Sequence, residues 1–136
     1  MQGKVLLIDD DVDLVEINRT ALERAGYQVD VAYNGREGLA KALRQLPDVI
    51  VLDVVMDKVG EGFDVVSRLK LDPRTEDIPI ILLTSLNRLL RPLPFGVHPE
   101  WLPVYALLDK PVSPDRLVLE VERALAGKSD TAQNTG

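Results

Sequence analysis

The stretch KVLLIDDD, residues 4–11, joins a short apolar run directly to three acidic residues. Two later stretches are built in the same way: VIVLD, residues 49–53, ends on Asp53, and ALLDKP, residues 106–111, carries Lys110. Short apolar runs of this kind are typical of strands in a parallel sheet that is covered by helices on both faces. If the three strands are parallel, their carboxyl ends open onto one edge, and the charged side chains meet there.

Short apolar runs alternate with amphipathic stretches along the chain, which predicts repeated βα units around a doubly wound, parallel α/β sheet. The strands are expected at residues 4–8, 28–32, 49–52, 79–84 and 104–108. Helices are expected to begin after the caps Asp11, Asn34 and Ser113, with a further helix over residues 63–71. Proline and glycine recur between residues 86 and 103, so an irregular loop is expected there in place of a helix.

Two details of the helices are also predicted. In the first helix, the spacing of Leu14, Ile17, Ala21 and Leu22 predicts that these residues form the stripe that faces the core. The last helix is expected to end at Gly127, so that residues 1–127 form one domain and residues 128–136 a disordered polar tail.

The composition excludes several classes of function. A chain of 136 residues fits one domain, and the lack of cysteine excludes disulfides and thiolate metal sites. The net charge of −6 disfavours direct nucleic-acid binding, which needs a basic surface. No apolar run is long enough to cross a membrane and no leader precedes the first strand, so we expect a cytoplasmic protein without membrane contact.

The acidic residues predict a metal site. Asp9, Asp10 and Asp53 would repel one another at the sheet edge unless a cation neutralised them, and carboxylate oxygens are ligands that suit Mg²⁺. Next to such an ion, Asp53 can act as a nucleophile toward phosphorus. Lys110 and the hydroxyl of Thr84, at the end of the fourth strand, can then contact the phosphoryl oxygens.

With these residues in this order, the chain resembles the receiver domains of bacterial response regulators, including the chemotaxis regulators, over about residues 3–126. The resemblance implies a flavodoxin-like sheet in the order 2-1-3-4-5 and a two-component signalling switch that accepts a phosphoryl group rather than an enzyme. It implies that Asp53 is the phosphoacceptor, and that the donor is a sensor histidine kinase or a phosphotransfer protein. Asp9, Asp10, Asp53 and the Val55 carbonyl would bind Mg²⁺, Thr84 and Lys110 would bind the phosphoryl group, and the bond before Pro111 would be cis.

The chain departs from the family pattern at four places. Asp57 stands where the family has a proline, and the following glycine, Gly62, is displaced by one residue. Leu107 replaces an aromatic switch residue, and the proline-rich loop replaces or shortens the family's fourth helix. The output is therefore expected to differ, with Phe95, Trp101 and Tyr105 as candidate contacts for an unidentified downstream protein.

Two other functions are consistent with parts of the pattern. A magnesium phosphohydrolase of the haloacid-dehalogenase type would need a second acid two residues after the nucleophile, and Val55 occupies that position. A receiver-like docking module that works without phosphorylation would fit the altered loops. Asp11 is expected to cap a helix rather than bind metal, and His98 is expected to be a solvated loop residue.

Overall fold

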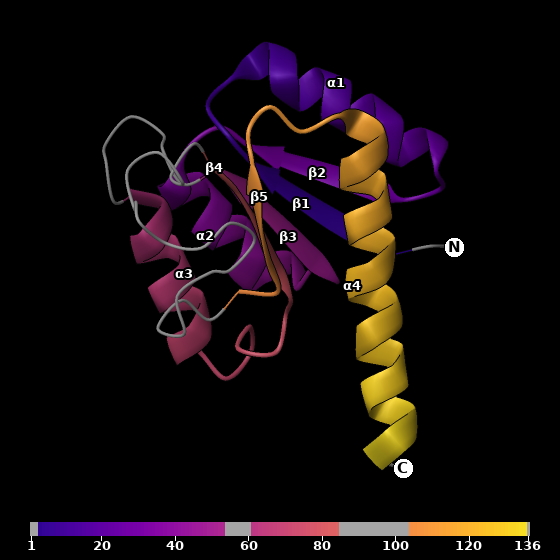
Figure 1. Cartoon of the computed structure of the whole chain (residues 1–136). Helices are drawn as coiled ribbons and strands as arrows, with labels where there is room; N and C mark the ends of the chain where they lie inside the picture. The colour runs from indigo at the N-terminus through magenta and orange to yellow at the C-terminus, as the bar shows by residue number, and fades with distance from the viewer. Residues whose placement is uncertain (1–2, 54–60, 85–103, 136) are drawn as a thin grey trace, which may run out of the picture.

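The computed structural model describes residues 3–53, 61–84 and 104–135 of the chain (Figure 1). In these residues strands and helices alternate along the sequence, except that the last two strands follow each other without a described helix between them. The elements are β1 (Lys4–Ile8), α1 (Val12–Arg24), β2 (Gln28–Ala32), α2 (Gly35–Gln45), β3 (Val49–Asp53), α3 (Glu61–Leu71), β4 (Ile80–Thr84), β5 (Ala106–Asp109) and α4 (Pro114–Thr135). The label α4 thus belongs to the helix that the sequence predicts after Ser113.

The five strands form one parallel sheet in the order β2-β1-β3-β4-β5, which confirms the predicted topology. The register aligns Ile8 of β1 with Leu52 of β3, and Thr84 of β4 with Asp109 of β5. Because all strands run the same way and end at nearly the same level, the residues that follow them lie along one edge of the sheet.

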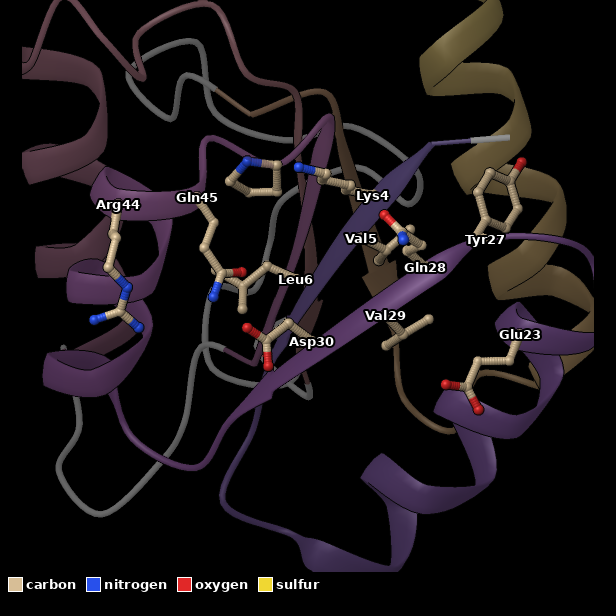
Figure 2. Close-up of a pocket in the computed structure, with 11 residues that line it drawn as sticks. Lys4, Val5, Leu6, Glu23, Tyr27, Gln28, Val29, Asp30, Arg44 and Gln45 are labelled. Atoms are coloured by element: carbon tan, nitrogen blue, oxygen red, sulfur yellow. The ribbon is translucent and has the colours of Figure 1, made fainter. Parts of the chain in front are cut away.

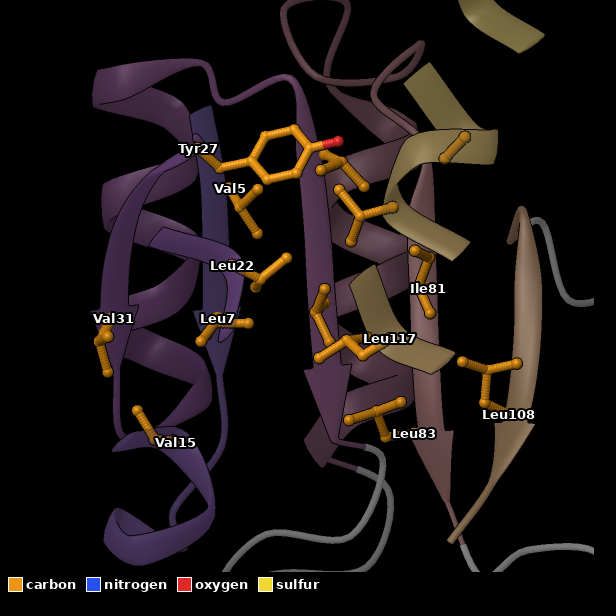
Figure 3. Close-up of a cluster of buried hydrophobic side chains, with 14 residues drawn as sticks. Val5, Leu7, Val15, Leu22, Tyr27, Val31, Ile81, Leu83, Leu108 and Leu117 are labelled. Carbon is orange, nitrogen blue, oxygen red and sulfur yellow. The ribbon is translucent and has the colours of Figure 1, made fainter. Parts of the chain in front are cut away.

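Helices cover both faces of the sheet, with α1 and α4 on one face and α2 and α3 on the other (Figure 1). The strand residues alternate between the two sides. Leu6 and Ile8 belong to the core cluster under α2 and α3, whereas Val5 and Leu7 belong to the cluster under α1 and α4. Figure 3 shows the second cluster, in which Leu22 of α1 and Leu117 of α4 point toward the strands. These two layers explain why the strands are apolar almost throughout.

The expected capping residues begin three of the helices. The Asp11 side chain accepts a hydrogen bond from the Leu14 N–H, and Asn34 accepts one from Glu37 in the same way. The Ser113 hydroxyl oxygen accepts the Arg116 N–H at 3.1 Å. Each contact satisfies one of the N–H groups that the first turn of a helix leaves without an intrahelical partner.

Two predicted details differ in the structure. Leu22 is buried as predicted, but Ile17 is 53% exposed, because the other buried residues of α1 are Val15 and Asn18, each one position after a residue of the predicted stripe. The polar side chain of Asn18 concealed this stripe in the sequence. In addition, α4 continues beyond Gly127 to Thr135, where a disordered tail was expected. No proline interrupts residues 128–135, and Lys, Ala and Gln in this segment are compatible with a helix.

Among the helices of the described segments, none has both the length and the apolar character that a membrane span requires.

Candidate functional site

Three carboxylates converge at the carboxyl edge of the sheet. Asp9 follows the last residue of β1, and Asp53 is the last residue of β3. Since Ile8 and Leu52 are aligned in neighbouring strands, the acids that follow them are brought together. Asp9, Asp10 and Asp53 each offer an oxygen within 4.8 Å of those of the other two. Asp9 and Asp53 are buried, whereas Asp10 is exposed.

Lys110 approaches this carboxylate cluster from β5. Its ammonium nitrogen Nζ lies 3.0 Å from Asp53 Oδ2 and 3.9 Å from Asp9 Oδ2. The Asp53 side chain is only 4% exposed, so its contact with Lys110 is shielded from solvent much more than a surface ion pair. A cation held at this position also faces any group that becomes bonded to the Asp53 carboxylate.

The environment of Asp9 raises its pKa to about 6. Burial is the largest cause, and the negative charge of Asp53 acts in the same direction. The backbone N–H of Asp11, which donates to Asp9 Oδ1 at 3.0 Å, and the charge of Lys110 oppose this rise only in part. The surroundings of Asp9 thus disfavour its ionised form.

The donor set fits a magnesium ion. Mg²⁺ prefers oxygen ligands and characteristically uses one or two carboxylates together with water. The cluster supplies carboxylate oxygens from three acids, and the exposed position of Asp10 leaves one side open to solvent. Burial and the charge of Asp53 disfavour the ionised form of Asp9, and a divalent cation beside it would stabilise that form. Asp9, Asp10 and Asp53 are therefore the residues that could hold the ion.

Thr84, which the sequence associates with the same site, is the last residue of β4. Strand β4 lies between β3 and β5, and the register aligns Thr84 with Asp109, the residue before Lys110. The backbone of Thr84 is thus at the same sheet edge as Asp53 and Lys110. The peptide bond between Lys110 and Pro111 is cis, as the family resemblance implies.

The candidate output residues are only partly described. Tyr105 is 43% exposed, and its backbone N–H donates to the Ile80 carbonyl at 2.8 Å. Leu107, which replaces the family's aromatic residue, packs against the core cluster under α2 and α3. Several residues that the sequence analysis singled out lie outside the described residues, namely Val55, Asp57, Phe95, His98 and Trp101.

One functional contact was not predicted from the sequence, namely the hydrogen bond from the Asp11 N–H to Asp9. The signal for it is local, because an aspartate often accepts a hydrogen bond from the backbone two residues further on. Asp11 therefore contributes twice at this edge: its side chain caps α1, and its main chain holds the Asp9 carboxylate.

A separate pocket of about 680 Å³ opens at the other end of the sheet (Figure 2). It is lined by the first residues of β1 and β2 and by the end of α2, including Lys4, Gln28 and Arg44. Since the carboxylate cluster lies beyond the carboxyl ends of the strands, this pocket takes no part in the chemistry described above.

Comparison with known families gives a match over residues 5–122 to the model described as the response regulator receiver domain. The chain is 47% identical over 89 residues to the DNA-binding dual master transcriptional regulator RpaA of Synechocystis sp., a match that covers 63% of this chain and 35% of RpaA. It is 35% identical over 132 residues to the response regulator SaeR of Staphylococcus epidermidis, covering 92% of this chain and 51% of SaeR. The chain thus spans about half or less of the length of these curated relatives.

Among solved structures, the chemotaxis response regulator CheY4 of Vibrio cholerae superposes with a TM-score of 0.78 at 31% identity. This match covers 92% of the present chain and 100% of that one. A putative response regulator from Chloroflexus aurantiacus superposes with a TM-score of 0.79 at 28% identity, covering 93% and 99% of the two chains.

Proposed function

Because this chain belongs to the response regulator receiver domain family of two-component signalling, we propose that it is a phosphorylation-activated switch in which Asp53 accepts the phosphoryl group. The observation that carries the proposal is the position of Lys110, whose ammonium lies 3.0 Å from Asp53 within a cluster of three carboxylates. A carboxylate held between acidic metal ligands and a fixed cation is suited to attack phosphorus.

The proposed reaction transfers a phosphoryl group from a phosphohistidine to Asp53. A carboxylate oxygen of Asp53 forms a bond to phosphorus while the bond from phosphorus to the histidine nitrogen breaks, and that nitrogen keeps the electron pair and takes up a proton. Magnesium would supply positive charge toward the phosphoryl oxygens; Asp9, Asp10 and Asp53 would hold it, and the family resemblance adds the Val55 carbonyl as a further ligand.

Two side chains act on the transferred group in this proposal. Lys110 contacts Asp53 Oδ2 before the transfer, and it pairs with a phosphoryl oxygen once that carboxylate has become an acyl phosphate. The Thr84 hydroxyl donates to another phosphoryl oxygen, which its place at the end of β4 supports. Both contacts exist only after phosphorylation, so they supply the difference in interaction that a switch requires.

The proposed partners are a sensor histidine kinase or phosphotransfer protein as donor and a downstream protein as target. We assign the receiver domain to residues 1–127. RpaA is described as binding DNA, whereas the present chain has a net charge of −6 and matches only 35% of RpaA, so we assign no nucleic-acid contact to the described domain.

Acetyl phosphate provides the direct test. Purified protein is incubated with acetyl phosphate and Mg²⁺, and its intact mass is measured, with EDTA in a parallel sample. We expect the mass to rise by one phosphoryl group in the presence of Mg²⁺ and to stay unchanged in EDTA. A protein that folds and binds Mg²⁺ but never gains this mass would instead be a docking module that works without phosphorylation.

A further inference from the structure

A long-range hydrogen bond joins the first residues of α2 and α3. The backbone N–H of Gly35 donates to Glu61 Oε1 at 2.8 Å, across 26 positions of sequence. Gly35 is the first residue of α2 and Glu61 is the first residue of α3. The bond thus ties together the starts of two helices on the same face of the sheet.

The first turn of α2 is fitted closely between two neighbours. A Cβ atom at Gly38 would lie 2.5 Å from Ile8 Cδ1, and one at Gly35 would lie 2.9 Å from both Glu61 Oε1 and Val65 Cγ2. These positions accept glycine alone without displacement of their neighbours. Since Ile8 is the residue before Asp9, this turn fills the space between the end of β1 and the beginning of α3.

The charge of Glu61 suits this position. A helix N-terminus carries free N–H groups and a partial positive charge, both of which favour a nearby carboxylate. The Asn34 side chain already accepts the N–H of Glu37 at 2.8 Å, and Glu61 accepts a different N–H from another part of the chain. Asn34 therefore caps α2 locally, whereas the contact of Glu61 holds the first residue of α3 against the first residue of α2.

We propose that Glu61 is a positioning residue for the carboxylate site, acting through the first turn of α2. Gly38 of this turn lies against Ile8, the residue before Asp9, so the bond from the Gly35 N–H to Glu61 helps to fix how α2 packs against the end of β1. The inference rests on the proposed function, because it assigns Glu61 an effect on Mg²⁺ affinity at that site.

Calorimetry of Mg²⁺ binding to the full chain tests this role directly. We expect Glu61→Ala to weaken Mg²⁺ binding by up to about fivefold, the limit reached if the energy of one ordinary hydrogen bond is fully coupled to metal binding. Glu61→Gln keeps an oxygen that can accept the Gly35 N–H, so its affinity should stay within about twofold of the wild type. Gly35→Ala, which would displace Glu61, should weaken binding in the same direction as Glu61→Ala.

Asp64→Ala is the matched control. It removes the same charge from the first turn of α3, but the Asp64 carboxylate is exposed and pairs with Arg68 at 3.0 Å. We expect its Mg²⁺ affinity to stay within about twofold of the wild type, as for other screened surface charges. All variants are compared well below their unfolding temperatures, so that a loss of stability alone does not change the result.

The outcomes separate this inference from the proposed function. Equal Mg²⁺ affinity in Glu61→Ala and the wild type would overturn the role of Glu61, and so would an equal loss in Asp64→Ala. If the wild type binds Mg²⁺ but gains no phosphoryl mass, the proposed function fails, while the calorimetric comparison still decides the role of Glu61.

Discussion

The Lys110 ammonium lies 3.0 Å from Asp53 Oδ2, although 57 residues separate the two in the sequence. Strand β4 lies between the strands that carry them, so the long lysine side chain spans the distance from β5 to β3. This contact neutralises part of the negative charge of the carboxylate cluster. Lys110 therefore interacts with the same acids that a magnesium ion would use.

Lys110→Met should separate metal binding from phosphoryl transfer. Without the ammonium, Asp53 and Asp9 lose a competing cation, so Mg²⁺ affinity should be equal to that of the wild type or higher. The initial rate of labelling by acetyl phosphate should fall about 100-fold, the effect typical of removing one group that stabilises transition-state charge. Calorimetry and intact-mass time courses measure the two quantities.

The exposed Lys4, at the opposite end of the sheet, provides the control, and Lys4→Met should change neither quantity. Labelling of Lys110→Met at the wild-type rate would show that Lys110 has no part in the transfer.

Asp9→Asn should change how stability depends on pH. The pKa of Asp9 is raised to about 6 in the folded protein from the usual 3.8 of an aspartate, so between these values the folded state retains a proton that the unfolded chain has lost. The free energy of unfolding in Mg²⁺-free buffer should therefore fall as pH rises through this window, by no more than about 3 kcal/mol from this group. The asparagine variant lacks this titration and should gain stability relative to the wild type as pH rises.

Urea unfolding at a series of pH values measures the difference. Asp13→Asn, which removes an exposed carboxylate from the first turn of α1, is the control for the loss of one negative charge. Wild type and Asp9→Asn with the same slope between pH 4 and pH 6 would contradict the assignment of the raised pKa to Asp9.

The sequence was sufficient for the sheet and for the residues at its carboxyl edge. Charged residues that follow apolar runs, such as Asp9, Asp53 and Lys110, indicate where strands stop. Parallel strands must place those ends at one edge of the sheet. It was not sufficient for the face of α1, since burial of Asn18 depends on its neighbours in space. The contact between Glu61 and Gly35 had no local signal either, because each residue alone is an ordinary helix start.

The phosphorylated protein should be long-lived. The positions two residues after Asp53 and two after Thr84 hold Val55 and Leu86, and neither side chain can orient an attacking water. Because such help contributes a factor of about 100 to hydrolysis, we expect a half-life of tens of minutes or more. Leu86→Asn should shorten it about tenfold. The control is Leu71→Asn, at a position on α3 that is 82% exposed, and it should leave the half-life unchanged. Decay of the phosphorylated wild type within seconds would refute the prediction.

The output should involve residues 86–103 and the neighbouring Tyr105. Leu107 packs against the core and has no ring to reorient, so the movement of Thr84 toward the phosphoryl group should pass directly to the chain that follows β4. Hydrogen exchange with and without beryllofluoride should show added protection in residues 86–103 and at Tyr105. Protection limited to the residues around Asp53 would exclude this segment as the output element.

The most direct test of the central claim is the chemical identification of the phosphorylated residue. Protein labelled with acetyl phosphate and Mg²⁺ is reduced with borohydride, which converts an aspartyl phosphate into homoserine, and the peptides are then sequenced by mass spectrometry. The account predicts homoserine at position 53 and no incorporation of phosphoryl mass in Asp53→Asn. Homoserine at another aspartate, or equal labelling of Asp53→Asn, would contradict it.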